Sequence, residues 1–388
     1  MGSPVLYPKV IKYNGNVDNN TGKTAYQYAI YKAGNFVPHT FMSSGNYGSL
    51  DNAWDQGNLV KETAFKKAGN TYLPVSEKNY VYDRFNFKQE YGVALRRYCT
   101  GDVNCGRTET ANGMMYYTFY EYQIQTGVNK LISEETIYYD QFDTSKTLRN
   151  SKAYAYDNTV HFYPAETNST DSKGQAVKEQ VKYPFDLAGS DLVLNRMVAN
   201  NILAVPVESY RYVNTNLVYT EKNTFQSWNG LNNLIRPLKK EVFYGAEASP
   251  VRIDYRAYDS VGNVNEQAKA NDASEVYLWG YNNQYPVAKV TGSRYDTVAA
   301  LVNRNLLQRP PGDQELRTEL DKIRTALSGK ALVATYTYKP LVGMTSETDA
   351  TGKTIYYEYD AFGRLKLIRD KDLKIIKSFD YRFNEQAQ

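Results

Sequence analysis

The last stretch of the chain, residues 356–383, is the feature that most restricts what this sequence can fold into. Tyr357 and Tyr359 alternate with polar residues, so both rings belong to one face of a strand. Asp360–Gly363 then supplies turn residues, with glycine where a positive φ is needed, and Leu365 resumes the period of two. The pattern predicts short antiparallel hairpins.

The same phrase occurs about a hundred residues earlier, which indicates a repeated strand-turn-strand unit. Two clean copies of Tyr-Asp-x-x-Gly are present, and each is followed by a polar residue and a hydrophobic one. The defining residues are Tyr258, Asp259 and Gly262 in the first copy, and Tyr359, Asp360, Gly363 and Arg364 in the second. Such a unit is typical of a repetitive β structure and does not resemble a catalytic pattern.

Tyrosine is unusually frequent, with 37 in 388 residues, and its spacing favours strands. Seven pairs have a spacing of two, which places both rings of a pair on one strand face. The pairs are Tyr26/Tyr28, Tyr80/Tyr82, Tyr120/Tyr122, Tyr154/Tyr156, Tyr210/Tyr212, Tyr336/Tyr338 and Tyr357/Tyr359. These rings are either structural rungs or a platform for sugars or a protein partner, with Trp54, Trp228 and Trp279 as further candidate binding aromatics.

The periodicity along the chain predicts a mainly β fold with a small helical insertion. Residues 1–186 form a β-rich region in which short strand patterns are separated by Gly-Asn turns. Residues 187–294 begin with one helix over 187–201, capped by Ser190 or Asp191, and continue as strands. A helical hairpin is expected over 295–330, with Asp313 as the cap of its second helix, and hairpins over 331–388.

Charge and apolar patterns argue against a nucleic-acid-binding protein and against a membrane-spanning segment. The net charge of +4 comes from 46 basic and 42 acidic residues without long runs, which argues against a nucleic-acid partner. No apolar run approaches the length of a membrane span. The first residues lack the basic and apolar regions of a secretory signal, and the last ones stop abruptly, so we expect a fragment of a longer protein.

The two cysteines, Cys99 and Cys105, bracket a turn-forming stretch. A disulfide between them would place the chain in an oxidising compartment and would add about 2 to 3 kcal/mol of stability. The alternative is half of a metal site, since no histidine lies nearby. We favour the disulfide.

No catalytic constellation is visible. The only histidines, His39 and His161, lie in a turn-like stretch and in an expected strand. Neither of the carboxylate pairs Glu134/Glu135 and Asp140/Asp143 shows a common orientation. Because the Gly-rich phosphate loop and the calcium-loop pattern are also absent, the sequence predicts no enzyme activity and no cofactor.

Several segments closely resemble the RHS/YD-repeat family, in the form found in large secreted or cell-surface proteins of Bacteroidetes. The strongest are RAYDSVGNV at 256–264, LWGYNNQYPVAKV at 278–290, and the run over 336–376. YPKV at 7–10 and KYPFD at 182–186 are similar to the upstream part of the same proteins.

The resemblance implies an antiparallel β-strand spiral or sandwich-like sheets with YD-type hairpins, in an exported protein at the cell surface or outside the cell. Its expected role is a structural or encapsulating scaffold, with a Tyr/Trp-lined binding module for glycans or a protein partner as the alternative. The implied partner is the rest of its own polypeptide, namely further YD repeats and a C-terminal toxin. One departure is Asp370–Leu373, where family members carry glycine at the last position, so we expect a looser turn there.

Overall fold

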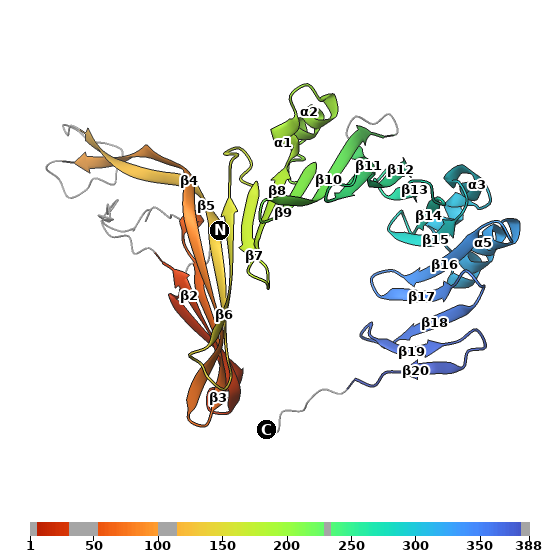
Figure 1. The fold of residues 1–388 in the computed structure, drawn as a ribbon, viewed down its shortest axis with the longest axis horizontal. Helices are drawn as coiled ribbons and strands as arrows, with labels where there is room; N and C mark the ends of the chain where they lie inside the picture. Colours follow the sequence, from red (N-terminus) through yellow and green to blue (C-terminus); the bar gives the residue numbers. More distant parts are fainter. Residues whose placement is uncertain (1–5, 31–52, 100–114, 229–233, 382–388) are drawn as a thin grey trace. The chain divides into compact units, whose positions relative to one another are not determined.

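The computed structural model describes residues 6–30, 53–99, 115–228 and 234–381, and it divides into two compact units (Figure 1). The first unit comprises residues 1–181 and 211–216, and the second comprises 182–210 and 217–388. The three borders expected from the sequence, after 186, 294 and 330, all lie within the second unit. Both units are built from antiparallel strands, which confirms the mainly β fold class.

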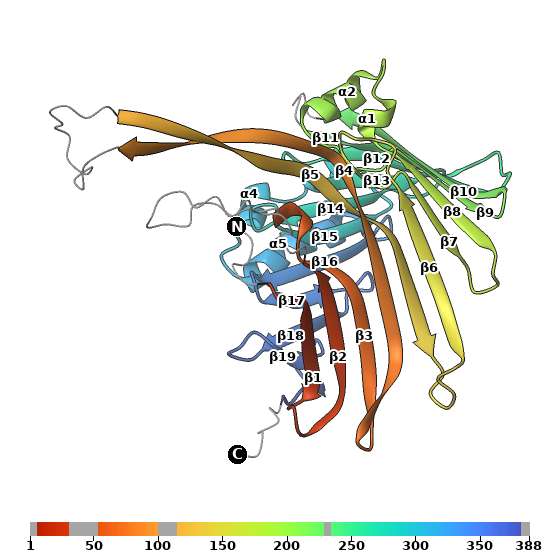
Figure 2. The same cartoon turned by 90° about the vertical axis from the view of Figure 1, so that its left-hand side faces the viewer.

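In the first unit each strand pairs with the next one along the chain, from β1 to β8. The long strands lie side by side in Figure 2. Their bounds are β1 Lys9–Gly15, β2 Asn20–Ala29, β3 Asn58–Ala68, β4 Thr71–Cys99, β5 Met115–Tyr139, β6 Thr147–Ala155, β7 Glu166–Thr170 and β8 Ala176–Lys182. A short 3-10 helix, η1, occupies Ala53–Asp55.

The second unit begins with two short helices, α1 (Pro184–Leu187) and α2 (Leu192–Ala199), where the sequence predicted one. Asp191 caps α2 as expected, because its carboxylate accepts from the Val193 and Leu194 amides. β9 (Glu208–Val213) spans the division between the units.

From β10 to β20 each strand again pairs with its successor. The bounds are β10 Asn216–Ser227, β11 Ile235–Tyr244, β12 Val251–Tyr258, β13 Val264–Lys269, β14 Glu275–Gly280, β15 Tyr285–Thr291, β16 Leu332–Lys339, β17 Gly343–Thr348, β18 Thr354–Tyr359, β19 Leu365–Arg369 and β20 Ile375–Ser378.

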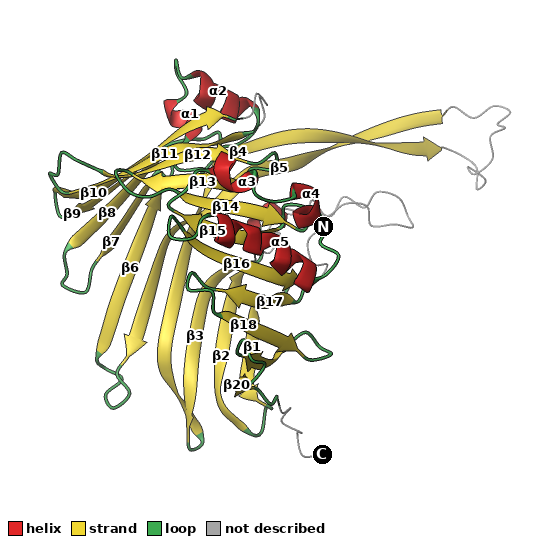
Figure 3. Ribbon diagram, turned by 90° about the vertical axis from the view of Figure 1, so that its right-hand side faces the viewer, coloured by secondary structure: helices red, strands yellow, loops and turns green. Residues whose placement is uncertain are grey.

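The helical insertion lies between β15 and β16, yet these strands still pair directly. It contains three helices, α3 (Tyr295–Ala299), α4 (Arg304–Gln308) and α5 (Asp313–Ala326), which Figure 3 shows on one side of the neighbouring strands. Its apolar stripe packs on β14, β15 and β16 and forms the largest core cluster of the described residues. The expected cap was wrong: Gly312 is the N-cap of α5, and Asp313 lies in its first turn.

The β4–β5 hairpin runs well past its neighbours (Figure 2). β3 pairs with β4 only as far as Asn79, and β6 pairs with β5 only from Ser133 onward. The β4–β5 ladder nevertheless continues to Cys99 and Met115. In the described part of the chain the outer half is therefore a two-stranded ribbon, an arrangement that is only marginally stable by itself.

An elbow at the root of this ribbon supports it. The register shifts between Phe85 and Lys88, which is the signature of a β-bulge and bends the strand. Trp54 of η1 lies against Gly127 of β5 so closely that a Cβ there would be 2.8 Å from the Trp54 Cη2 atom. The buried carboxylate of the next residue, Asp55, accepts from Asn129 Nδ2 at 2.7 Å and forms an ion pair with Arg84.

We expect Gly127→Ala to destabilise this elbow by about 1–3 kcal/mol, because the added methyl group overlaps the Trp54 ring. Urea unfolding and amide hydrogen exchange of the ribbon would measure the effect. In a Trp54→Ala background the same substitution should cost clearly less, since the opposing ring is gone. Equal costs in the two backgrounds would contradict this contact.

Candidate functional site

One turn geometry links successive strands at five places. In each, the N–H of an aspartate donates to the carbonyl of the residue four positions later. The N–H of the residue three positions later donates back to the aspartate carbonyl. The Oδ1 atom of the aspartate accepts from the amides two and four residues further on. The aspartates are Asp171, Asp259, Asp349, Asp360 and Asp370.

Only two of these turns were recognisable from the repeated Tyr-Asp phrase. Asp171 and Asp349 were missed because no tyrosine precedes them, although the Asp-x-x-Gly spacing is present in both. The informative signal is therefore the aspartate and the residue three positions later. In four turns that residue is a glycine with φ between +75° and +95°, namely Gly174, Gly262, Gly352 and Gly363.

The fifth turn corrects the expectation that Asp370–Leu373 would be loose. Leu373 adopts φ +62°, and its amide donates to the Asp370 carbonyl at 3.0 Å as in the other four turns. Its side chain is 60% exposed, so solvent accommodates it. The aspartate bonds hold the backbone in a conformation that leucine rarely adopts.

The two tyrosines of the repeated phrase have a structural role. Tyr258 donates its hydroxyl to the Pro237 carbonyl at 3.0 Å, and Tyr359 donates to the Met344 carbonyl at 2.8 Å. Pro237 belongs to β11 and Met344 to β17, the strands that precede those of the two tyrosines. Each phenol therefore joins its own strand to the backbone of the preceding one. Burial raises the pKa of both phenols, and both remain protonated at neutral pH.

Arg364 completes the second copy by holding the turn aspartate. Its Nε donates to Asp360 Oδ2 at 2.7 Å, while its own amide donates to Oδ1 of the same carboxylate. These bonds, the backbone one foremost, keep the pKa of Asp360 below its usual range. Asn263 takes the corresponding place in the first copy and donates to Asp259 Oδ2 at 2.9 Å.

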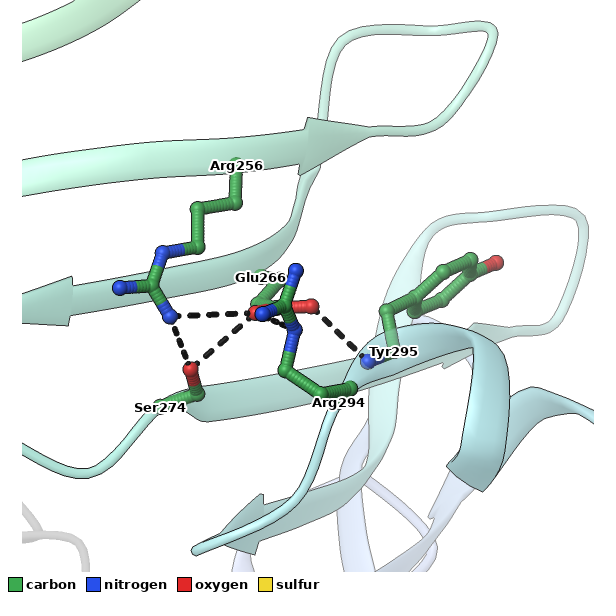
Figure 4. A network of polar contacts seen from close by, with 5 residues as sticks. All are labelled: Arg256, Glu266, Ser274, Arg294 and Tyr295. Carbon is green, nitrogen blue, oxygen red and sulfur yellow. Dashed lines mark hydrogen bonds and ion pairs between the residues drawn. The ribbon is translucent and has the colours of Figure 1, made fainter.

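Glu266 of β13 lies at the centre of a network of polar contacts (Figure 4). It is 3% exposed, and Arg294 Nε lies 2.9 Å from its Oε1 atom. Ser274 Oγ donates to the same oxygen at 3.1 Å, and Arg256 Nη1 lies 3.5 Å away. Oε2 accepts from the Tyr295 amide at 2.9 Å. Because Arg294 and the Tyr295 amide both bond to it, Glu266 anchors the start of α3 to the sheet.

The tryptophans do not form an exposed platform. Trp228 is buried against Tyr258, with ring centroids 4.9 Å apart, and its Nε1 donates to the Arg236 carbonyl. Trp279 donates its Nε1 to the Val264 carbonyl at 2.9 Å. Trp54 packs at the ribbon elbow. Their surroundings depend on tertiary contacts that sequence spacing does not reveal.

The cysteines and histidines, the remaining candidate site residues, do not form a common site in the described part of the chain. Cys105 and the side chain of Cys99 lie outside the described residues, as does His39, so the disulfide stays a prediction. His161 accepts from the Tyr163 amide and stacks on its ring. In the described ranges no group of three acidic, histidine or cysteine side chains converges as metal ligands, and no helix is long and apolar enough to cross a membrane.

The carboxylate pair Glu134/Glu135 is split between the two faces of β5. Glu135 pairs with Arg149 at 3.1 Å, whereas Glu134 accepts from the Tyr154 hydroxyl at 2.7 Å. Glu134 borders an open groove of about 690 Å³ over β5, β6 and the β7–β8 turn, which sequence reasoning did not find. Its lining residues are polar apart from Leu148 and Gly174, and they include both signs of charge.

Comparison with known proteins gives structural similarity at very low sequence identity. No family model matches the chain, and no curated protein matches it either. Similar solved structures include TcdB2-TccC3-TEV (TM-score 0.46, 8% identity, 94% of this chain) and TcdB2-TccC3 without its hypervariable C-terminal region (0.43, 9%, 94%). A third is a Tc holotoxin pore of Photorhabdus luminescens with the mutation TccC3-D651A (0.29, 10%, 93%). The chain spans about a fifth of each of these chains, and at such TM-scores the likeness assigns neither family nor function.

We expect Leu373→Gly to stabilise the protein by up to about 1 kcal/mol. The gain of removing a left-handed leucine, about 1–2 kcal/mol, is partly offset by the greater freedom of glycine in the unfolded chain. Urea unfolding would measure the change. The matched variant is Gly363→Leu in the equivalent turn, which should destabilise by a similar amount, and opposite signs in this pair are the expected result. A destabilising Leu373→Gly would show that Leu373 contributes packing that its exposure conceals.

Glu266→Gln should destabilise the second unit by about 1–3 kcal/mol, because it removes a charge that Arg256 and Arg294 share in a buried position. Glu275→Gln is the matched control, since the Glu275–Lys289 pair is about one-third exposed and should cost less than about 1 kcal/mol. Chemical denaturation of both variants compares them. Equal losses would mean that burial of Glu266 adds nothing to its ion pairs.

Proposed function

We propose that the chain is a non-catalytic structural segment of an exported RHS/YD-repeat protein, acting at the cell surface or outside the cell. Its role is to form part of a wall that encloses or displays other polypeptide, with the rest of its own polypeptide as the principal partner. Further YD repeats and a C-terminal toxin are the partners that the family resemblance favours. No catalysis is part of this role.

One observation carries the proposal: the ladder grows by one hairpin at a time in chain order and ends on an open edge. β18, β19 and β20 are joined by the same aspartate turn, at Asp360 and Asp370. Because the turn depends on five consecutive residues only, the same unit can be repeated without any change of geometry.

The last strand supports continuation of the ladder. Within the described residues β20 pairs only with β19, and its other edge has no strand partner. Ile375 and Ile376 are 57% and 55% exposed. An exposed apolar edge strand is a hazard that proteins normally cover, so a following strand is the natural occupant.

The alternative of a glycan-binding module receives no support from the tryptophans. Trp228 is buried, and the indole N–H groups of Trp228 and Trp279 are already bonded to backbone carbonyls. A sugar platform requires exposed rings with polar groups around them.

Cryo-electron microscopy of the natural full-length polypeptide would test the structural role. We expect a following strand to pair with β20, and the sheet to form part of a wall around other polypeptide. A β20 that remains an open edge in that polypeptide would overturn the proposal.

A matched pair of variants in the same polypeptide sharpens the test. The Phe379 amide donates to Lys366 on the β19 side, so alternation directs the Ser378 amide outward. Ser378→Pro should therefore block the next strand, spare β19, and expose the following region to protease. Ser378→Ala should behave like the natural protein.

A further inference from the structure

Another open edge of the described residues lies in the first unit, on β6. β5 pairs with β6 from Thr147 to Ala153, whereas β7 pairs only with Lys152–Ala155. β6 therefore runs on beyond the end of the β7–β8 hairpin, as Figure 3 shows. Over Thr147–Ser151 no strand of the described chain pairs with the edge of β6 that faces away from β5.

The backbone groups of this edge point away from β5. The Lys146 carbonyl accepts from the Asp140 amide on the β5 side, and the Ala155 carbonyl accepts from the Ala165 amide on the β7 side. Backbone direction alternates along a strand, and no register shift interrupts β6. The N–H and C=O groups of Thr147 and Arg149 and the N–H of Ser151 consequently project from the free edge, whereas the Ser151 carbonyl faces the Thr170 amide at the end of the β6–β7 ladder.

This edge borders the open groove of about 690 Å³. The groove is bounded by β5, by β6 and by the turn between β7 and β8. The lining residues that matter here are Glu134, Leu148, Arg149, Lys152, Ser169 and Asp171. Leu148 is 64% exposed and offers the only large apolar side chain of the lining. Arg149 is already paired with Glu135, and the other charged lining residues, Glu134, Lys152 and Asp171, carry both signs, so the groove does not select a strongly charged ligand.

We propose that the groove binds an extended peptide segment, which adds to β6 as a further strand. The backbone donors and acceptors of Thr147 and Arg149, together with the Ser151 amide, provide the main-chain hydrogen bonds of such a pairing. Leu148 favours an apolar side chain at one position of the peptide. Five residues of edge span about 17 Å, and the Asp171 turn lies at one end of it. A glycan is less suited, because the lining holds no aromatic ring on which a sugar would stack. This proposal does not depend on the proposed wall function.

The test uses the full chain and a fluorescein-labelled probe peptide, Lys-Thr-Val-Thr-Val-Thr-Glu, in a fluorescence polarisation titration. We expect saturable binding and slowed hydrogen exchange of the Thr147, Arg149 and Ser151 amides. Two probes that are N-methylated on alternate amides should differ in affinity, because only one of the two sets of peptide amides faces β6. One should lose at least tenfold in affinity while the other binds normally.

Ser151→Pro removes an edge donor while leaving the β5 pairing intact, and it should weaken the probe at least tenfold. Ser151→Ala, which keeps the backbone amide, should bind like the natural chain. If Ser151→Pro fails to fold, the difference in affinity between the two N-methylated probes still tests whether the peptide pairs with the β6 backbone. No binding at 1 mM (about −4 kcal/mol), equal affinity for both methylated probes, or protection outside 147–151 would each overturn the proposal. So would binding of an oligosaccharide in place of the peptide.

Discussion

The hydrogen bonds between an aspartate carboxylate and two backbone amides are the interaction on which the hairpins depend. Each of the five turns places four hydrogen bonds within five residues, and two of the four end on one Oδ1 atom. A turn bonded so completely fixes the register of the strands on either side of it. The strand pairing of β17 to β20 follows from these local bonds, since three of the five turns join those four strands.

Leu373 shows how strongly the carboxylate determines the turn. Leucine opposes a positive φ, and glycine occupies the equivalent position in the other four turns. The backbone still closes with the same bonds, because Oδ1 of Asp370 accepts from the Asp372 and Lys374 amides and because the leucine side chain is exposed to solvent. A local preference of one residue is thus overcome by several bonds from its neighbour.

Much of the fold was readable from the sequence because it depends on short-range patterns. Most strands of the first unit were correctly expected from alternation, although β7 was missed and the strand expected around His161 is a turn. The apolar spacing of Leu316, Leu320 and Ile323 correctly predicted the buried face of α5. Features that depend on tertiary contacts were not readable. The alternation suggested two separate strands, over 115–125 and 130–139. The structure has one continuous strand, β5, and Trp54 approaches its backbone at Gly127, between the two expected segments. The burial of Trp228 and the bonding of Glu266 likewise depend on residues from other strands.

The open edges of β20 and of β6 differ in a way that suits different occupants. β20 presents Ile375 and Ile376 to solvent, and apolar edges of this kind need permanent cover. The β6 edge carries Arg149, which is paired with Glu135, together with Asn150 and Ser151. Charged and polar residues on an edge oppose uncontrolled pairing and leave the backbone groups hydrated. A peptide that binds there must displace this water, so its net gain is the small difference between two sets of hydrogen bonds. Such an edge is suited to reversible binding, whereas the β20 edge is suited to the next strand of the same polypeptide.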